Sequence, residues 1–249
     1  MSTIHTQLRA LGIGSGDVVM MHSSMKSLML DISPENFLHE LMAVLTDTGT
    51  LLLPALTYEE VTFENLYFSV TESEPCVGIL PKTFLRMGGV VRSMHPTHSV
   101  CAWGAKADIL TRDHILDNTP VGPHSPFMLL PGVNGKFLFV GDILHSCTFI
   151  HGIEEIVDAQ YAMNKEQTLY RLKDTNGVIH EKAYYTHNFK GWEQEYTRIR
   201  DILVYPDIRE GIIGHAPCTL IDSSKLKTAA VERFQKDIYA FVSPAGSPD

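Results

Sequence analysis

Two short, uninterrupted apolar segments on either side of one amphipathic helix constrain the fold of this chain most strongly. Residues 17–21 and 50–54 lack the polar–apolar alternation of a strand with one solvated face. Between them, Ser33 precedes a proline at the expected first helical position, and apolar residues recur at helical spacing over 34–46. A strand–helix–strand unit with covered strands is typical of an α/β fold with a parallel sheet.

Further along the chain, the same reasoning predicts more strands. Residues 136–140 form a third apolar segment, and residues 218–222 form the last one. Residues 168–173 and 178–186 are joined by Asp174-Thr-Asn-Gly177, which is a typical hairpin turn. We therefore expect an α/β/α layered fold with a mixed, mainly parallel central sheet and an appended β-hairpin.

The C-terminal part of the chain is expected to be mostly helical. We predict a polar helix over residues 191–203 and a final helix that Ser223 caps and that runs through Phe241. No internal repeat or linker divides the sequence, so residues 1–242 are predicted to form a single domain. Residues 243–249 are rich in Pro, Gly and Ser and are predicted to be a frayed tail.

Composition excludes several functional classes. The 249 residues include 20 Lys and Arg against 29 Asp and Glu, a formal charge of −9 that argues against a nucleic-acid partner. No apolar run approaches the roughly 20 residues of a membrane span. The N-terminus has no signal-peptide pattern and the four cysteines form no CxxC, so we expect a cytoplasmic protein with free thiols and no membrane partner.

Half of the twelve histidines lie between residues 95 and 151. His95 and His98 are three residues apart on a predicted loop beside a proline, where functional side chains often gather. This spacing is compatible with a metal site, with contacts to a cofactor, or with imidazoles that cap backbone groups. The spacing alone does not decide among these.

A second group of polar residues, 141–155, follows a predicted strand and begins a helix. Ligands bind at the carboxyl ends of strands in open α/β sheets. On the helix, His151 shares a face with Glu154 and Glu155, and a carboxylate there can fix the imidazole tautomer that a general base needs. An acidic helix face with an ordinary histidine is the alternative. A zinc-protease helix would need a second histidine at the motif spacing, which this segment lacks.

Two turns could bind an anion through backbone N–H groups. Residues 22–27 follow the first predicted strand, and residues 118–126 end at a helix N-terminus. Plain polar turns explain both segments equally well. The chain has no Rossmann, P-loop or nucleophile-elbow motif.

Taken together and in this order, these segments resemble the aminoglycoside 3-N-acetyltransferase family, which is unrelated to the GNAT fold. The resemblance covers nearly the whole chain. It rests on HSSMKS at 22–27, RSMHPTHSVCAWG at 92–104, TPVGPHSPF at 119–127, CTFIHGIEE at 147–155, THNFKGWEQEY at 186–196 and GIIGHAPCTLID at 211–222.

The resemblance implies acetyl-CoA as co-substrate and direct acylation of an amine of an aminoglycoside or related amino sugar. His151 matches the family's essential histidine, so we assign it as general base with Glu154 as its catalytic partner. Glu155 and Asp142 are expected to contact a cationic acceptor. The coenzyme A contacts that carry over are His22, Ser23, Ser24, His95, Pro96 and Ser99. Backbone N–H groups around Ser23–Ser24 or Ser99 are expected to stabilise the oxyanion.

One departure from the family pattern concerns the support of the base. Many members carry Asp six residues before the histidine, where this chain has His145, so Glu154, Glu155 or Asp142 would have to substitute. Two alternatives remain at this point. One is a metal-dependent hydrolase that uses the clustered histidines His95, His98, His145 and His151, and the other is a non-catalytic relative that binds coenzyme A. Oligomeric state is left open.

Overall fold

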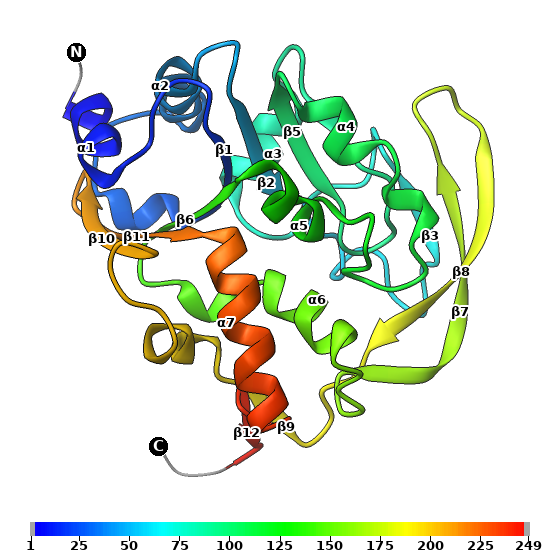
Figure 1. The fold of residues 1–249 in the computed structure, drawn as a ribbon. Helices are drawn as coiled ribbons and strands as arrows, with labels where there is room; N and C mark the ends of the chain where they lie inside the picture. The colour runs from blue at the N-terminus through cyan, green and yellow to red at the C-terminus, as the bar shows by residue number, and fades with distance from the viewer. Residues whose placement is uncertain (1–2, 247–249) are drawn as a thin grey trace.

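A seven-stranded sheet forms the centre of the computed structural model, which describes residues 3–246 (Figure 1). Its strand order is β10-β11-β6-β1-β2-β5-β4. The strands are β1 (Val18–Ser23), β2 (Thr50–Pro54), β4 (Val91–Arg92), β5 (Val100–Gly104), β6 (Lys136–Val140), β10 (Ile208–Ile213) and β11 (Ala216–Asp222).

Parallel pairing is confined to the middle of this sheet. β1 pairs in parallel with β2 and with β6, whereas the β2–β5, β4–β5, β6–β11 and β10–β11 pairs are antiparallel. The α/β class and the mixed sheet are confirmed, but the sheet is not mainly parallel. The tight connection from β10 to β11 reverses the chain direction, which only an antiparallel pair permits. The sequence analysis did not predict β10.

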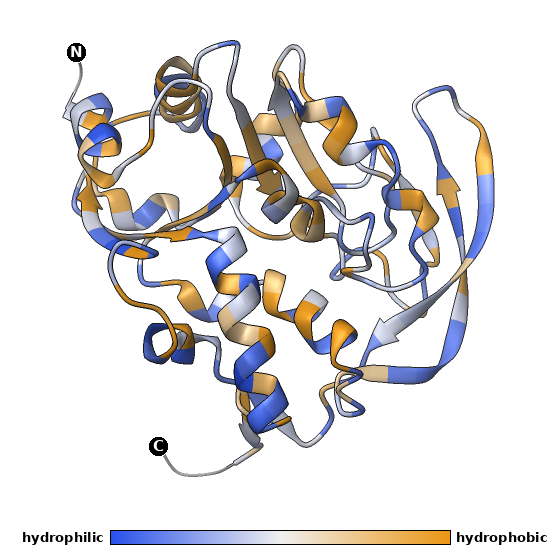
Figure 2. Cartoon of the chain, in the orientation of Figure 1, coloured by the Kyte–Doolittle hydropathy of each residue, from blue (hydrophilic) through white to orange (hydrophobic). Residues whose placement is uncertain are grey.

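Two hydrophobic cores, one on each face of the sheet, confirm the α/β/α layering. Val18 and Met20 of β1 lie in one core, and Val19 and Met21 lie in the other, because successive strand residues face opposite sides. The helices on the first face are α4 (Ala107–Thr111), α5 (Pro126–Leu129), α6 (Phe149–Ile156) and α7 (Ser223–Lys236); those on the second are α1 (Thr3–Leu11), α2 (Pro34–Leu45) and α3 (Ile79–Leu85). Figure 2 shows apolar residues concentrated in the central strands.

Helix starts are set by local caps. Ser33 accepts a hydrogen bond from the Asn36 N–H at 3.1 Å, as the sequence predicts for α2. The predicted cap of α7 is wrong by one residue: Asp222 accepts from the N–H groups of Ser224 and Lys225, while Ser223 donates to the Gly135 carbonyl. α7 also ends at Lys236, before Phe241.

The predicted hairpin is confirmed as β7 (Met163–Lys173) and β8 (Ile179–His187), and it projects beside the main sheet (Figure 1). β3 (Tyr67–Ser69) pairs in parallel with β7 to complete a three-stranded sheet. A small third core holds this sheet to the rest of the chain and contains Val61, Phe68, Val70, Tyr170, Leu172 and Tyr184.

Residues 191–203 do not form the predicted helix. They contain β9 (Trp192–Gln194) and a 3-10 segment (Tyr196–Asp201). β9 pairs with β12 (Val242–Pro244), so the predicted frayed tail is wrong for Ser243 and Pro244. Residues 247–249 lie outside the described residues. Other 3-10 segments are Met25–Leu28, His114–Leu116, Leu130–Val133 and Leu144–Ser146. Within residues 3–246, no helix is long and apolar enough to cross a membrane.

Candidate active site

A cavity of about 830 Å³ opens at the carboxyl ends of β1 and β2, where an α/β sheet most often binds ligands. Its walls come from parts of the chain that are distant in sequence. The lining includes Met21, His22 and Ser23 at the end of β1, Tyr58, Val61 and Phe63 from the segment after β2, Thr97 and His98 from the loop before β5, His145, Thr148 and His151 around the start of α6, Thr186 and His187 at the end of β8, and Phe189 and Tyr196 after the hairpin.

His151 occupies the first turn of α6 and faces this cavity. Its Nδ1 lies 2.9 Å from Oε2 of Glu154, and its side chain is 13% exposed. Nε2 has no hydrogen-bond partner among residues 3–246. A carboxylate only accepts, so Nδ1 carries the proton and the lone pair lies on Nε2. The predicted pair His151 and Glu154 is therefore brought together as the i,i+3 spacing indicated.

Glu154 is fully buried and accepts hydrogen bonds from two phenols as well as from His151. Tyr161 Oη lies 3.1 Å from Oε1, and Tyr196 Oη lies 3.2 Å from Oε2. Tyr196 Oη is also 2.8 Å from His151 Nδ1. Burial is the main reason that the pKa of Tyr196 lies well above its usual value, and the negative charge of Glu154 is the second. Both phenols therefore donate to the carboxylate.

Sequence reasoning assigned no role to either tyrosine. Tyr196 falls inside the segment 186–196 that resembles the family, which was the available signal. Tyr161 had none, because it lies in the turn after α6, outside every segment that resembles the family.

Two further histidines face His151 across the cavity. The ring of His187 lies 4.3 Å from the His151 ring and 4.9 Å from the His98 ring, centroid to centroid. Burial, reinforced by the neighbouring imidazoles, lowers the pKa of His98 and of His187 well below 6.5. Both rings are therefore neutral near pH 7 and do not oppose a positive charge on His151. His187 was not predicted as a site residue.

His95 and Pro96 do not line the cavity, although Thr97 and His98 of the same loop do. His95 Nδ1 accepts from the N–H groups of His98 at 2.9 Å and Thr97 at 3.2 Å, and its Nε2 donates to the Thr119 carbonyl at 3.1 Å. The Pro96 carbonyl accepts from Thr57 at 2.6 Å. Both ring nitrogens of His95 are occupied by backbone, so this histidine holds the loop, and the expected coenzyme A contact is not available to it.

Ser99 and Ser24 are engaged inside the protein as well. The Ser99 hydroxyl donates to the Ala55 carbonyl at 2.7 Å and accepts from Arg92 Nε at 2.9 Å. The Ser24 N–H donates to the Val140 carbonyl at 2.8 Å, so it is not free to stabilise an oxyanion. Neither residue lines the cavity.

His22 and Ser23 are the members of the predicted coenzyme A set that do line the cavity. The His22 ring stacks on Phe139 with centroids 4.9 Å apart. Burial lowers the pKa of His22 to about 3, and its buried Nε2 has no hydrogen-bond partner among the described residues. The Ser23 hydroxyl also has no partner within residues 3–246.

The two carboxylates expected to meet the acceptor are outside the cavity lining. Glu155 accepts from the Thr119 hydroxyl at 2.6 Å and from the Val121 N–H at 2.8 Å, so it fixes the loop before α5. The Asp142 side chain is 78% exposed and opposes Arg200 at 3.6 Å. Of the three carboxylates considered as partners of the base, Glu154 is the one that contacts it. His145 lines the cavity but makes no hydrogen bond with His151.

The clustered histidines do not form a metal site in the described part of the chain. No three His, Cys, Asp or Glu side chains between residues 3 and 246 are arranged to hold a metal ion. The rings that meet, His98, His151 and His187, stack edge to face or tilted, which is a packing arrangement.

Comparison with known proteins identifies the family of this chain. A family model described as "Aminoglycoside 3-N-acetyltransferase" matches residues 20–235, which is most of the chain. The chain belongs to this family. Its members are acyltransferases, and acetyl-CoA is the acetyl donor of the named relatives.

Curated relatives of this acetyltransferase-family chain carry the same family name. Aminoglycoside N(3)-acetyltransferase IV from Salmonella sp is 29% identical over 243 residues, which cover 96% of this chain and 88% of the relative. Aminoglycoside N(3)-acetyltransferase VII from Streptomyces paromomycinus is 33% identical over 170 residues, which cover 61% of this chain and 59% of the relative.

Solved structures share the fold. An aminoglycoside acetyltransferase of type AAC(3)-IVa, in complex with gentamicin, matches with a TM-score of 0.81 and 24% identity. The match covers 97% of this chain and 90% of the AAC(3)-IVa chain. AAC-IIIb, as a binary complex with CoASH, matches with a TM-score of 0.77 and 24% identity. The match covers 99% of this chain and 98% of the AAC-IIIb chain. At this level of identity, the likeness concerns the fold.

Proposed function

We propose that this chain transfers the acetyl group of acetyl-CoA directly to an amine of an aminoglycoside or related amino sugar, with His151 as general base. The observation that carries the proposal is the state of the His151 ring. Its Nδ1 is bound to a fully buried carboxylate, while Nε2 has no partner among residues 3–246 and the ring lines the cavity.

Only the neutral amine has a lone pair, so an ammonium first loses one proton to solvent. The amine nitrogen must lose a second proton as the amide forms, and this step requires a base. Nε2 takes the proton from the amine nitrogen as that nitrogen bonds to the acetyl carbon and the carbon–sulfur bond breaks. The proton then leaves with the thiol of coenzyme A. Glu154 holds the ring in the tautomer that exposes the Nε2 lone pair, and its charge stabilises the imidazolium while the proton is on His151.

The cavity offers polar atoms for both substrates. The orphaned Nε2 of His22 and the free hydroxyl of Ser23 fit the amide-rich arm of acetyl-CoA, and we assign them as its contacts. The segment after β2 brings Tyr58 and Phe63 to the cavity wall beside the exposed Glu59 and Glu64. Neither glutamate lines the cavity itself, but carboxylates next to this wall favour the approach of a cationic acceptor over that of the phosphates of coenzyme A, so we place the acceptor on this side.

The test is thiol release from acetyl-CoA with a panel of aminoglycosides, amino sugars and polyamines, with the product identified by mass spectrometry. We expect transfer to an amino sugar, and we expect His151→Gln to lower kcat by about 10²- to 10⁴-fold. Coenzyme A binding, measured by calorimetry, should persist in His151→Gln. Normal turnover in that variant would overturn the assignment of the base. Coenzyme A binding without turnover over the whole panel would indicate a non-catalytic relative.

A further inference from the structure

The Glu154 carboxylate is buried beside the base without a permanent cation. Among the described residues, no Lys or Arg contacts it, and its one ionisable basic partner is His151 itself. A buried carboxylate without compensation is costly, and it commonly neutralises by binding a proton. Here the compensation comes from the hydroxyls of Tyr161 and Tyr196, which lie 3.1 Å and 3.2 Å from its oxygens.

We propose that Tyr161 and Tyr196 are positioning residues for the pair His151 and Glu154. Tyr161 acts on His151 through Glu154 alone, whereas Tyr196 contacts both Glu154 and Nδ1 of His151. The two phenol donors hold the buried carboxylate in place against Nδ1. This inference rests on the proposed role of His151 as base.

Neutral donors suit this task better than cations would. A lysine or arginine beside Glu154 would cancel its charge and weaken its attraction for the imidazolium that forms during the reaction. A phenol stabilises the carboxylate by hydrogen bonding and leaves its charge in place. The pair therefore keeps one negative charge in a low-dielectric surrounding, where its effect on His151 is largest.

The other titratable groups near His151 and Glu154 add no positive charge that would offset the carboxylate. His98 and His187 are neutral because burial lowers the pKa of each, and burial raises the pKa of the Cys147 thiol to about 12. Glu155 turns away to Thr119 and Val121. The titratable groups that face His151, Glu154 and their two phenols are His98, His187, Cys147, Glu155, Asp237 and Tyr239.

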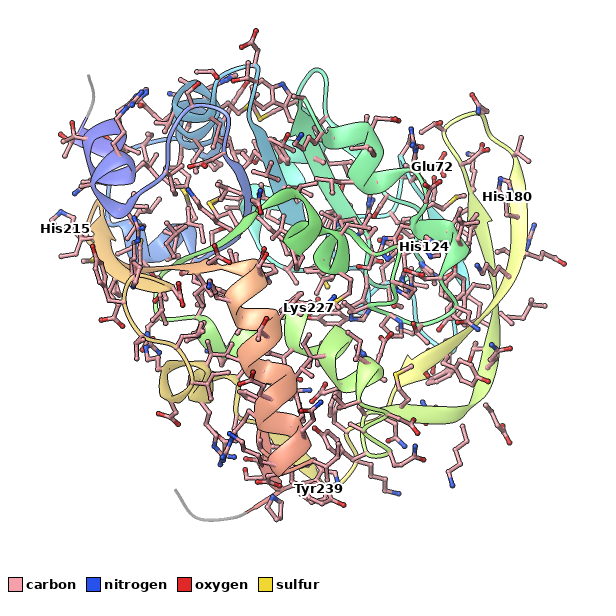
Figure 3. All side chains as sticks on the ribbon, viewed as in Figure 1. Glu72, His124, His180, His215, Lys227 and Tyr239 are labelled. Carbon is pink, nitrogen blue, oxygen red and sulfur yellow. The ribbon has the colours of Figure 1, made fainter. Side chains whose placement is uncertain are left out.

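Tyr161 is held from outside the cavity. Its ring lies 5.7 Å from the rings of Trp192 and Tyr239, which stack on each other at 4.7 Å. Figure 3 places Tyr239 just beyond the C-terminal end of α7. Tyr161 is absent from the cavity lining, so its hydroxyl does not touch substrate there. Any effect of that hydroxyl on catalysis must therefore pass through Glu154.

The kinetic test uses Tyr161→Phe and Tyr196→Phe, each with and without Glu154→Gln. We expect each single variant to lower kcat by about tenfold with the KM for acetyl-CoA unchanged. The acid limb of the kcat/KM profile should move to higher pH, since a carboxylate that loses a donor makes the His151–Glu154 pair bind a proton more readily. In the Glu154→Gln background, removing the Tyr161 hydroxyl should have no further effect, whereas removing the Tyr196 hydroxyl, which also contacts Nδ1 of His151, should lower the rate further.

The matched control is Tyr239→Phe. Its hydroxyl does not contact Glu154, while its ring keeps the same stack on Tyr161 and Trp192. We expect the wild-type rate and pH profile in this variant.

A second readout does not depend on turnover. The ring Cε1–H signal of His151 is assigned in histidine-labelled protein by its absence from the spectrum of His151→Gln, and it is titrated by NMR. We expect its midpoint to move to higher pH in Tyr161→Phe and not in Tyr239→Phe. If the wild-type protein acetylates no acceptor, the proposed function fails and this titration still decides the coupling.

Two results would overturn the inference. One is an unchanged rate profile and titration midpoint in Tyr161→Phe. The other is independent, multiplicative losses in the double variant of Tyr161→Phe with Glu154→Gln, which would indicate that Tyr161 contributes only to packing. If Tyr196→Phe does not fold, Tyr161→Phe, whose ring remains in the aromatic stack, decides alone.

Discussion

Glu154 follows His151 by one helical turn on α6, and its buried carboxylate accepts a hydrogen bond from Nδ1 at 2.9 Å. The next residue, Glu155, accepts hydrogen bonds from Thr119 and Val121 instead and holds the 119–121 loop. Two adjacent glutamates therefore have different tasks, one beside the base and one in the scaffold.

Glu154→Gln should lower kcat by about 100-fold or more, with little change in the KM for acetyl-CoA. A neutral amide does not stabilise the imidazolium, and its NH₂ group can turn towards Nδ1 and favour the wrong tautomer. The measurement is steady-state thiol release with the best acceptor. Glu35→Gln, at the exposed start of α2, serves as the control. A wild-type rate in Glu154→Gln would contradict the assigned pair.

Glu155→Ala should lower the free energy of unfolding by about 2 kcal/mol, because the Thr119 hydroxyl and the Val121 N–H lose their acceptor. The KM for the acceptor should stay the same, since Glu155 does not line the cavity. Urea unfolding and steady-state kinetics check the two statements, with the exposed Glu166→Ala as control. A raised KM at wild-type stability would restore Glu155 as an acceptor contact.

The buried histidines should make the fold sensitive to acid. Burial lowers the pKa of His114 to about 3, so from about pH 6.5 downwards the unfolded chain binds a proton that the folded chain does not. The free energy of unfolding therefore falls as the pH falls through this range.

His114→Asn should reduce this slope by about 1 kcal/mol per pH unit, and urea unfolding between about pH 6 and pH 4 measures it. Asn can keep a hydrogen bond to Ser93, which now lies 2.9 Å from Nδ1 of His114. The exposed His39→Asn is the control. An identical slope in wild type and His114→Asn would show that His114 does not contribute.

Gly152, next to His151, allows α6 to approach α5 closely. A Cβ at this position would meet the Met128 side chain and would lie 2.9 Å from Cγ1 of Val121. Gly152→Ala should therefore lower the free energy of unfolding by about 1–3 kcal/mol, although alanine favours a helix by about 1 kcal/mol.

The rate of Gly152→Ala should fall as well, because α6 carries the base and must shift. Thermal unfolding and kcat are the measurements, and Gly132→Ala, with open space around the added methyl, is the control. A stabilised variant with the full rate would mean that Met128 and Val121 move aside at no cost.

Local patterns predicted the elements that depend on neighbouring residues. β1, β2 and β6 lie where the continuous apolar segments placed them, and Asp174-Thr-Asn-Gly177 turns the hairpin as its residues require. Residues 191–203 were predicted wrongly because β9 is formed by pairing with β12, some fifty residues away. Polar helical periodicity within the segment carries no information about that partner.

In the candidate site, too, the sequence predicted the contacts between neighbouring residues and not the long-range ones. The sequence by itself placed both Glu154 and Glu155 on the helix face of His151, because residues three and four apart on a helix are neighbours. The structure decided that Glu154 is the one that contacts the base. The sequence also determined that His22 and Ser23 end a strand at the edge of the sheet where ligands bind.

Only the tertiary structure decided which polar residues face the cavity. His95 and His98 belong to one short motif, yet the backbone occupies both ring nitrogens of His95 while His98 lines the cavity. Tyr161 and Tyr196 reach Glu154 from outside its helix, Tyr196 from 42 residues further along the chain. The type and spacing of residues fix contacts within a helical turn, whereas long-range packing decides the partners of a buried charge.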